Sequence, residues 1–345
     1  MRATMIRAAA LFGTLALPAV GLGEAPGASS ETFVEISEAR KNEEGFLVHH
    51  VRSEYQSGPT QIKVLLPDRL EEGRRYAVLY VLPVEAGEGT RWGDGLVEVK
   101  KHDLHNRHRL ICVLPTFSHL PWYADHPTDP GIRQESHFVR VVVPFVERSY
   151  PAIREPEGRL LVGFSKSGWG AFSLLLRTPQ LFGKAAAWDA PLVEESPGRF
   201  GMGPIFGTRE NFEHYRISAL LETRADELRE NKRLVLTGYD NFRADHVKVH
   251  EQLAGLGIPH VYRDGPHREH QWHSGWLPEA VELLVEGHPT EGFPISSWCE
   301  GVPISSWCSS CTAAPRPGTA VQLLPQRNEE PESCSSTVPS RDASP

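Results

Sequence analysis

The sequence predicts an α/β fold in which a mostly parallel sheet carries helices on both faces. Short continuous runs of apolar, β-branched and aromatic residues recur along the chain, as in strands that are buried on both sides. Between these runs lie segments with apolar residues three and four positions apart, which is the spacing of a helix. Strands that alternate with helices in this way build a sheet with a helical layer on each side.

The first buried strand is expected over 76–82, where every residue is apolar or aromatic. The other runs of this kind are 110–114, 159–162, 184–188, 233–237 and 259–262. Two earlier segments, 46–54 and 60–66, are expected to pair as antiparallel strands at the start of the sheet. The segments with helical spacing are 135–148, 168–176, 215–229, 244–256 and 276–285.

The N-terminal segment has the composition of an export signal. Residues 1–23 contain Arg2 and Arg7, no acid, and then an apolar run that ends in small residues. This pattern is typical of a signal peptide, and the run is shorter than the roughly 20 strongly apolar residues of a spanning helix. We therefore expect a secreted or periplasmic protein with no membrane span, with a linker over 24–32.

The C-terminal segment 288–345 is rich in Pro, Ser, Thr and Arg and predicts a disordered, low-complexity tail. It contains one short duplication, in which the sequence of 294–299 returns at 303–308. The domain is thus expected over 33–287. Hydrophobic residues make up 40% of the chain, enough for a sizeable core. The net charge of −8 argues against nucleic acid as a partner, because phosphate binding favours a basic face.

The cysteines do not indicate a disulfide framework. Cys112 lies in an apolar run, where a free thiol behaves as a small hydrophobic residue. Within the tail, Cys308 and Cys311 have the spacing of a zinc or redox pair, but no second pair and no histidine accompany them. We expect no metal site. The tail also contains Cys299 and Cys334.

A glycine-rich turn follows the predicted strand 159–162. Its sequence is Gly163-Phe164-Ser165-Lys166-Ser167-Gly168, and a predicted helix comes next. A serine between small residues in a strand, turn and helix is typical of the nucleophile elbow of the α/β-hydrolase fold, usually G-x-S-x-G. Ser167 replaces the last glycine, and a serine is small enough to fit. We expect Ser165 to be the nucleophile; the plainer interpretation is a structural turn.

A serine nucleophile needs a base and an acid, which follow it in the order serine, acid, histidine in this fold. The loop after the last predicted strand contains three histidines, and we choose His270 over His267 and His273. For the acid we favour Asp240, at the carboxyl end of the strand 233–237. Two alternatives stay open: Asp245, one helical turn further on, and Asp189, at the end of the strand before.

An acyl-transfer site also needs backbone donors for the oxyanion. The N–H of Lys166, directly after the nucleophile, is expected to be one donor. The other is expected from the loop after the strand 76–82, which reads Pro83-Val84-Glu85. Proline has no N–H, so Val84 or Glu85 must supply it.

Taken together, these residues resemble the putative esterase family of α/β hydrolases, which includes esterase D-like enzymes, feruloyl and acetyl-xylan esterase domains and enterochelin esterases. The resemblance covers about 33–285, and the matching segments are 76–82, 163–171, 182–187 and 270–272. It implies an α/β-hydrolase fold and hydrolysis of a small-molecule or carbohydrate-linked carboxylic ester without cofactor or metal. It also implies catalytic roles for Ser165, His270 and Asp240.

The sequence departs from the family pattern at Ser167 and at the Pro83-Val84-Glu85 loop, where family members often have glycines. Alternative functions therefore stay open. One is a serine peptidase or acyltransferase on the same fold, since a fold does not fix a substrate. Another is a catalytically silent glycan-binding protein, in which Trp122 and Tyr123 stack on a sugar. Loop packing would explain these two aromatic residues equally well.

Overall fold

The computed structural model describes residues 33–287. The predicted signal peptide, the predicted linker and the predicted tail with its four cysteines lie outside the described residues. Within the described range, no helix is both long and apolar enough to cross a membrane.

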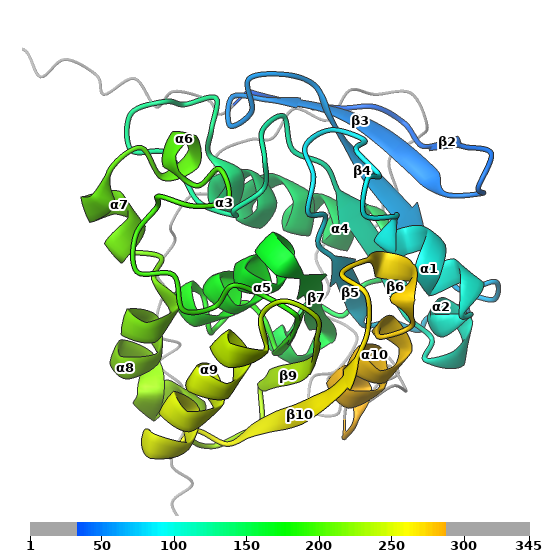
Figure 1. Ribbon diagram of the computed structural model, residues 1–345. Helices are drawn as coiled ribbons and strands as arrows, with labels where there is room; N and C mark the ends of the chain where they lie inside the picture. Colours follow the sequence, from blue (N-terminus) through cyan, green and yellow to red (C-terminus); the bar gives the residue numbers. More distant parts are fainter. Residues whose placement is uncertain (1–32, 288–345) are drawn as a thin grey trace, which may run out of the picture. The chain divides into compact units, whose positions relative to one another are not determined.

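One sheet organises the described residues (Figure 1). Within 33–287 its ten strands lie in the order β1-β3-β4-β6-β5-β7-β8-β9-β10, with β2 paired to β3. The strands are β1 (Val34–Ile36), β2 (Arg40–Lys41), β3 (Leu47–Ser53), β4 (Thr60–Leu65), β5 (Val78–Val81), β6 (Ile111–Pro115), β7 (Arg159–Phe164), β8 (Lys184–Trp188), β9 (Leu234–Tyr239) and β10 (His260–His267).

The sheet is mostly parallel, as the sequence predicts. All neighbours from β6 through β5, β7, β8 and β9 to β10 run parallel. The first strands run antiparallel: β3 pairs with β4, and β4 with β6. Every residue of β5 and β7 is buried, which explains their continuous apolar sequence.

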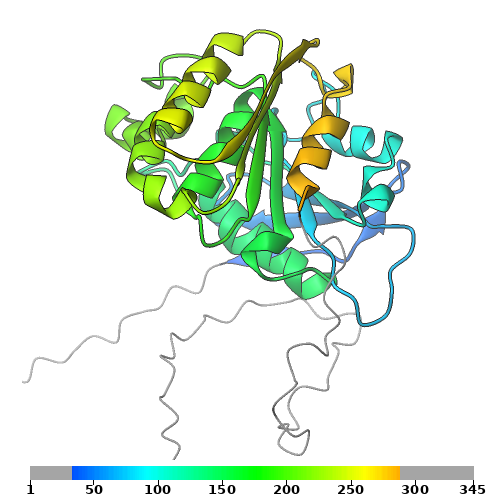
Figure 2. The same ribbon diagram turned by 90° about the horizontal axis from the view of Figure 1, so that it is seen from below.

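Helices cover both faces of the sheet (Figure 2). One face carries α4, α5, α8 and α9, whose apolar residues join one core cluster; α1, α2 and α10 join a second cluster on the other face. The helices are α1 (Gly95–Lys101), α2 (Leu104–Arg107), α3 (Gln134–His137), α4 (Val143–Ser149), α5 (Ser165–Arg177), α6 (Gly203–Phe206), α7 (Arg209–Glu213), α8 (Ile217–Leu228), α9 (Arg243–Gly255) and α10 (Leu277–Val285). Short turns of other helix types cover Phe138–Val142 (η1), Pro156–Gly158 (η2) and Trp272–Ser274 (η3).

The predicted helix over 135–148 is divided in the structure. A π-helical turn, η1, joins α3 to α4, and Pro144 stands in the first turn of α4. Proline cannot donate the helical hydrogen bond to the carbonyl four residues earlier, which is one reason for the irregular turn at this point. The apolar spacing revealed the helix but not this change in its winding.

The register between β7 and β8 positions two residues of the candidate site next to each other. Phe164 pairs with Trp188 at the carboxyl ends of these neighbouring strands. The next residues, Ser165 and Asp189, therefore leave the sheet side by side. In an open parallel sheet this edge is where binding sites form.

Candidate active site

Ser165 lies in a sharp turn between β7 and α5. Its φ of 52° is in the left-handed region, which a residue with a side chain rarely adopts. The backbone N–H of Ser165 donates to the carbonyl oxygen of Asp189 over 3.2 Å. The residue is 8% exposed, so Ser165 is buried rather than on the open surface. This is the geometry that a nucleophile elbow requires.

Ser167 stabilises the turn that contains Ser165. Its hydroxyl donates to the carbonyl oxygen of Phe164 (2.9 Å) and accepts from the N–H of the same residue (3.1 Å). Gly163 faces this serine, because a Cβ at Gly163 would lie 2.4 Å from the Ser167 carbonyl. Gly168 faces the loop after β8, where a Cβ would lie 2.8 Å from that of Ala190. The departure from the usual motif therefore keeps the tight turn and adds two hydrogen bonds.

The ring of His270 is held by Asp189. Its Nδ1 lies 2.6 Å from Oδ2 of Asp189. Since a carboxylate only accepts, Nδ1 carries the proton and Nε2 is left as a proton acceptor. No hydrogen bond joins His270 to the Ser165 hydroxyl in the described part of the chain, and in ligand-free sites such a bond often forms only when the substrate binds.

Asp189 is fully buried, at 0% exposure, and has a φ of 40°, so it too is in the left-handed region. Burial raises the pKa of this carboxyl, but hydrogen bonds from the His270 ring and from the N–H groups of Phe242, Asp240 and Asn241 outweigh it. The pKa therefore lies below its ordinary value, and Asp189 is a carboxylate at neutral pH. A buried, strained carboxylate against a histidine is typical of a functional site.

The favoured acid, Asp240, has a different position. One carboxylate oxygen accepts from the backbone N–H of His270 (3.0 Å), and the other lies 3.0 Å from Nε2 of His267. Asp240 thus contacts the backbone of the histidine loop, and the ring of His270 is paired with Asp189 instead. Asp245, the other alternative, accepts from the N–H of Val193.

Four aromatic rings surround the ring of His270. Ring centroids of Phe164, Trp92, Phe242 and Trp188 lie 5.0, 5.4, 5.9 and 6.3 Å from it. These contacts leave the imidazole little room to turn. Neither Trp92 nor Phe242 follows from the sequence pattern, because each comes from a loop. The only signal was that each is an aromatic residue shortly after a buried strand.

The proposed oxyanion donors lie on two neighbouring elements. Val84 and Glu85 follow β5, which pairs directly with β7, and Lys166 is in the first turn of α5. Among residues 33–287, no carbonyl or side chain accepts from the N–H of Val84 or Glu85. The first N–H groups of a helix likewise lack partners within the helix. Hydrogen-bond donors are thus available at both expected places.

Trp122 and Tyr123 are both fully buried, at 0% exposure, so neither ring can stack on a sugar in this structure. Trp122 packs against Trp169, and its indole N–H donates to the carbonyl of Phe200. Tyr123 donates its hydroxyl to the carbonyl of Pro83 over 2.7 Å. These are contacts of loop packing, and Tyr123 anchors the loop that carries Val84 and Glu85. Gly170 makes room for this tyrosine, since a Cβ there would lie 2.0 Å from its ring.

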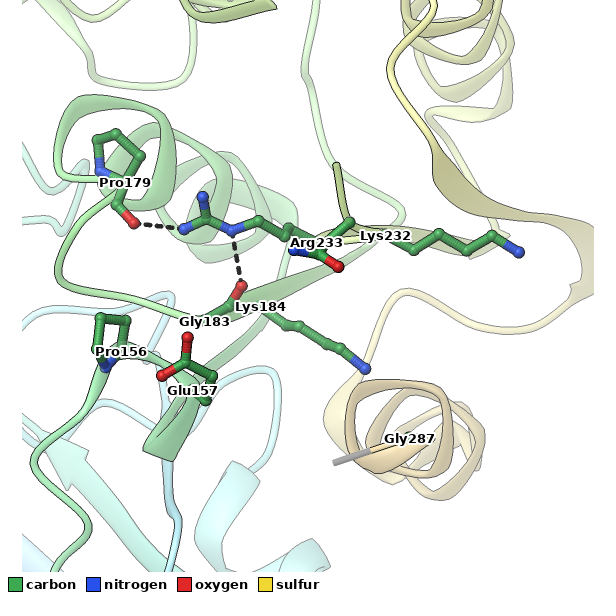
Figure 3. Close-up of a pocket in the computed structure, with 9 residues that line it drawn as sticks. Pro156, Glu157, Pro179, Gly183, Lys184, Lys232, Arg233 and Gly287 are labelled. Carbon is green, nitrogen blue, oxygen red and sulfur yellow. Dashed lines mark hydrogen bonds between the residues drawn. The ribbon is translucent and has the colours of Figure 1, made fainter. Parts of the chain in front are cut away.

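A cavity of about 440 Å³ lies at the opposite, amino end of β8 and β9 (Figure 3). Its lining contains several cations, but Arg233 donates to the carbonyls of Gly183 and Pro179, and Lys184 donates to that of Glu286. Arg233 and Lys184 thus hold the backbone, and the lining contains no serine, cysteine or histidine. We therefore place the candidate site at the carboxyl end. Within 33–287, no cluster of three or more His, Cys, Asp or Glu side chains could hold a metal ion.

The chain is similar to proteins of a known family. The model of the putative esterase family matches residues 53–241, more than half of the chain. The esterase Rv1288 of Mycobacterium tuberculosis strain H37Rv is 24% identical over 237 residues, which are 59% of this chain and 51% of Rv1288. Esterase MT1326 of strain CDC 1551 matches to the same extent. The chain therefore spans about half the length of these curated relatives.

Solved structures show the same fold. S-formylglutathione hydrolase of Staphylococcus aureus superposes with a TM-score of 0.56 at 16% identity, covering 70% of this chain and 98% of that one. The S-formylglutathione hydrolase of Agrobacterium tumefaciens gives 0.55 at 16% identity, covering 72% and 99%. A ferulic acid esterase gives 0.53 at 20% identity, covering 74% and 99%. At these identities the likeness establishes the α/β-hydrolase fold alone. With the family match over 53–241, the chain belongs to the putative esterase family.

Proposed function

We propose that this protein hydrolyses a carboxylic ester through a serine nucleophile, Ser165, with His270 as base and Asp189 as acid. The observation that carries the proposal is the 2.6 Å contact between His270 Nδ1 and Asp189, beside a serine with a φ of 52°. Membership of an esterase family supports ester hydrolysis as the reaction. The composition of residues 1–23 supports export as part of the same proposal.

In the proposed first step, Nε2 of His270 takes the proton of the Ser165 hydroxyl as its oxygen attacks the ester carbonyl. The N–H of Lys166 and the N–H of Val84 or Glu85 stabilise the resulting oxyanion. When the intermediate collapses, the C–O bond to the alcohol breaks and the imidazolium returns its proton to that alcohol. Losing one oxyanion donor typically lowers the rate about 100- to 1,000-fold.

In the second step, His270 deprotonates a water molecule that attacks the acyl-enzyme. The acid then leaves, and Ser165 regains its proton. Asp189 stays ionised throughout: it fixes the ring with Nδ1 protonated and stabilises the imidazolium charge. Its depressed pKa is consistent with this role.

Labelling with a fluorophosphonate probe tests the nucleophile. We expect the wild type to acquire one covalent adduct on the peptide that contains Ser165, and Ser165→Ala to acquire none. Ser173→Ala is the matched control, because Ser173 is a buried serine of the same helix and has no expected role. Equal labelling of wild type and Ser165→Ala would reject the assignment. Turnover of short-chain 4-nitrophenyl esters, against a panel of peptides, tests the reaction class.

A further inference from the structure

Two cationic side chains near the proposed site, those of Lys166 and Arg91, are used by nothing described above. Lys166 directly follows Ser165 and is half-buried. Burial lowers the pKa of Lys166, with Glu85 opposing the shift and Arg91 adding to it. The lysine thus lies within electrostatic reach of the loop that supplies the second oxyanion donor.

Arg91 is an exposed residue that lies near the same site. Its guanidinium lies 4.8 Å from the centroid of the Trp92 ring, and that ring is one of the four around His270. A cation over an aromatic face is attracted to it, so the contact holds Arg91 near the histidine. Lys166 therefore belongs to the elbow directly after Ser165, and Arg91 belongs to the loop after β5, beside a ring that contacts His270.

Neither cation is paired with a carboxylate. In the part of the chain that the structure describes, no carboxylate oxygen lies within 4.0 Å of the Lys166 ammonium or the Arg91 guanidinium. Other cations near the site differ: Arg199 pairs with Glu194, and Arg243 pairs with Asp264. The carboxylate of the nearby Glu85 accepts from the backbone N–H of Trp92 within its own loop and offsets only part of the positive charge of the two cations.

We propose that the site selects esters that carry a negative charge, such as a carboxylate, and that Lys166 with Arg91 recognises this charge. The inference rests on the proposed ester hydrolysis and adds the substrate class. Coulomb attraction is several times stronger at a partly buried site than in water, so an unpaired, half-buried ammonium favours an anionic partner. Lys166 acts here as a specificity residue through its side chain, separately from its backbone N–H.

The test compares two acyl groups of equal length. Mono-4-nitrophenyl adipate has a terminal carboxylate where 4-nitrophenyl hexanoate has a methyl group, and both release the same alcohol. We expect the wild type to favour the adipate about tenfold in kcat/KM, after subtraction of the enzyme-free rate. The preference should decrease as salt rises from 10 mM to 500 mM, because salt screens exposed charges.

A second arm places the charge on the alcohol. The butyrate ester of 4-hydroxybenzoate is compared with that of methyl 4-hydroxybenzoate, which lacks the charge. A preference for the charged member in either arm supports the inference, and the arm that shows it identifies which side of the ester Lys166 and Arg91 contact. Preference for the neutral member, or none, in both arms overturns it.

Variants assign the effect to the residues. Lys166→Met should abolish the charge preference, Lys166→Arg should retain it, and Glu85→Gln should increase it. Lys232→Met is the control, because Lys232 is exposed at the far end of the sheet. The readout is the ratio of kcat/KM for the charged and the neutral ester, measured on one protein. A general loss of activity lowers both values and cancels in this ratio. An unchanged ratio in Lys166→Met overturns the role of this residue.

Failure of the inference is distinguishable from failure of the proposed function. A wild type that accepts fluorophosphonate on Ser165 but shows no charge preference rejects the anionic substrate class and leaves the serine hydrolase intact. A wild type that neither accepts the probe nor cleaves any of the four esters rejects both.

Discussion

Ser165 and Asp189 are neighbours in space because the strands that precede them, β7 and β8, are neighbours in the sheet. The N–H of Ser165 donates to the carbonyl of Asp189 over 3.2 Å, and both residues have positive φ angles. The carboxylate of Asp189 then lies 2.6 Å from the His270 ring. One backbone contact therefore fixes the nucleophile relative to the group that orients its base.

The anchoring of the oxyanion loop by Tyr123 gives a first prediction. Removing the hydroxyl in Tyr123→Phe leaves the buried Pro83 carbonyl without its 2.7 Å partner. We expect about 1–2 kcal/mol lower stability and a reduced kcat with little change in KM, since the loop carries an oxyanion donor. Steady-state kinetics and urea unfolding measure these effects.

Tyr80→Phe is the control for this prediction. Tyr80 is also fully buried, but its hydroxyl has no hydrogen-bond partner in the described structure. Removing that hydroxyl should be neutral or stabilising. If Tyr80→Phe and Tyr123→Phe lower kcat equally, the hydrogen bond to Pro83 does not position the loop.

A second prediction concerns Ser167, which replaces the usual glycine. Ser167→Ala removes both hydrogen bonds to Phe164 and should destabilise the protein by about 1–3 kcal/mol. Ser173→Ala, in the same helix, removes a buried hydroxyl without a partner and should change stability little or favourably. The test compares the free energies of unfolding of the two variants. An equal loss of stability in both would contradict the role given to Ser167.

The α/β fold was predictable from the sequence because the central strands of its sheet are buried on both faces. Continuous apolar runs such as 76–82 identified β5 to β10 and their order along the chain. The sequence did not predict β1 and β2, because strands of two or three residues are too short to show an alternating pattern. It also did not predict α1 and α2, which are too short to show a helical spacing of apolar residues.

The candidate site was less predictable than the fold. Ser165 and His270 each follow a strand of the sheet, so the order of the strands predicted that the two residues lie close together. The order of the strands did not predict which carboxylate pairs with the His270 ring, because Asp189 and Asp240 both follow strands at the same edge. The choice depends on where the His270 side chain turns, which is decided by packing against Phe164, Trp92 and Phe242 rather than by sequence spacing.

Acid sensitivity is a third prediction, and it centres on His246. This residue is buried, and its Nε2 accepts from the N–H of Ala190, next to Asp189. Burial lowers the pKa of His246 to about 4, with Asp189 opposing the shift. Because the folded pKa is below the unfolded value of 6.5, this contribution to stability is complete above pH 6.5 and decreases as the pH falls towards 4.

Between pH 7 and pH 4.5 the expected loss from His246 is about 2.5 kcal/mol, at 1.36 kcal/mol per pKa unit. His246→Gln cannot take up this proton and should lose less stability over the same range. His137, whose pKa burial lowers to about 3, contributes equally to both proteins and cancels in the comparison. Identical losses in wild type and His246→Gln, from urea unfolding at the two pH values, would refute the prediction.

The identity of the acid is the central claim, and kcat/KM of Asp189→Asn against Asp240→Asn tests it most directly. An amide at 189 no longer holds the His270 ring with Nδ1 protonated, so we predict a loss of about 1,000- to 10,000-fold. Asp240 contacts only the backbone of His270, so Asp240→Asn should lose about tenfold or less. Both variants are checked for native unfolding curves. A loss in Asp240→Asn equal to or greater than that in Asp189→Asn would contradict the account.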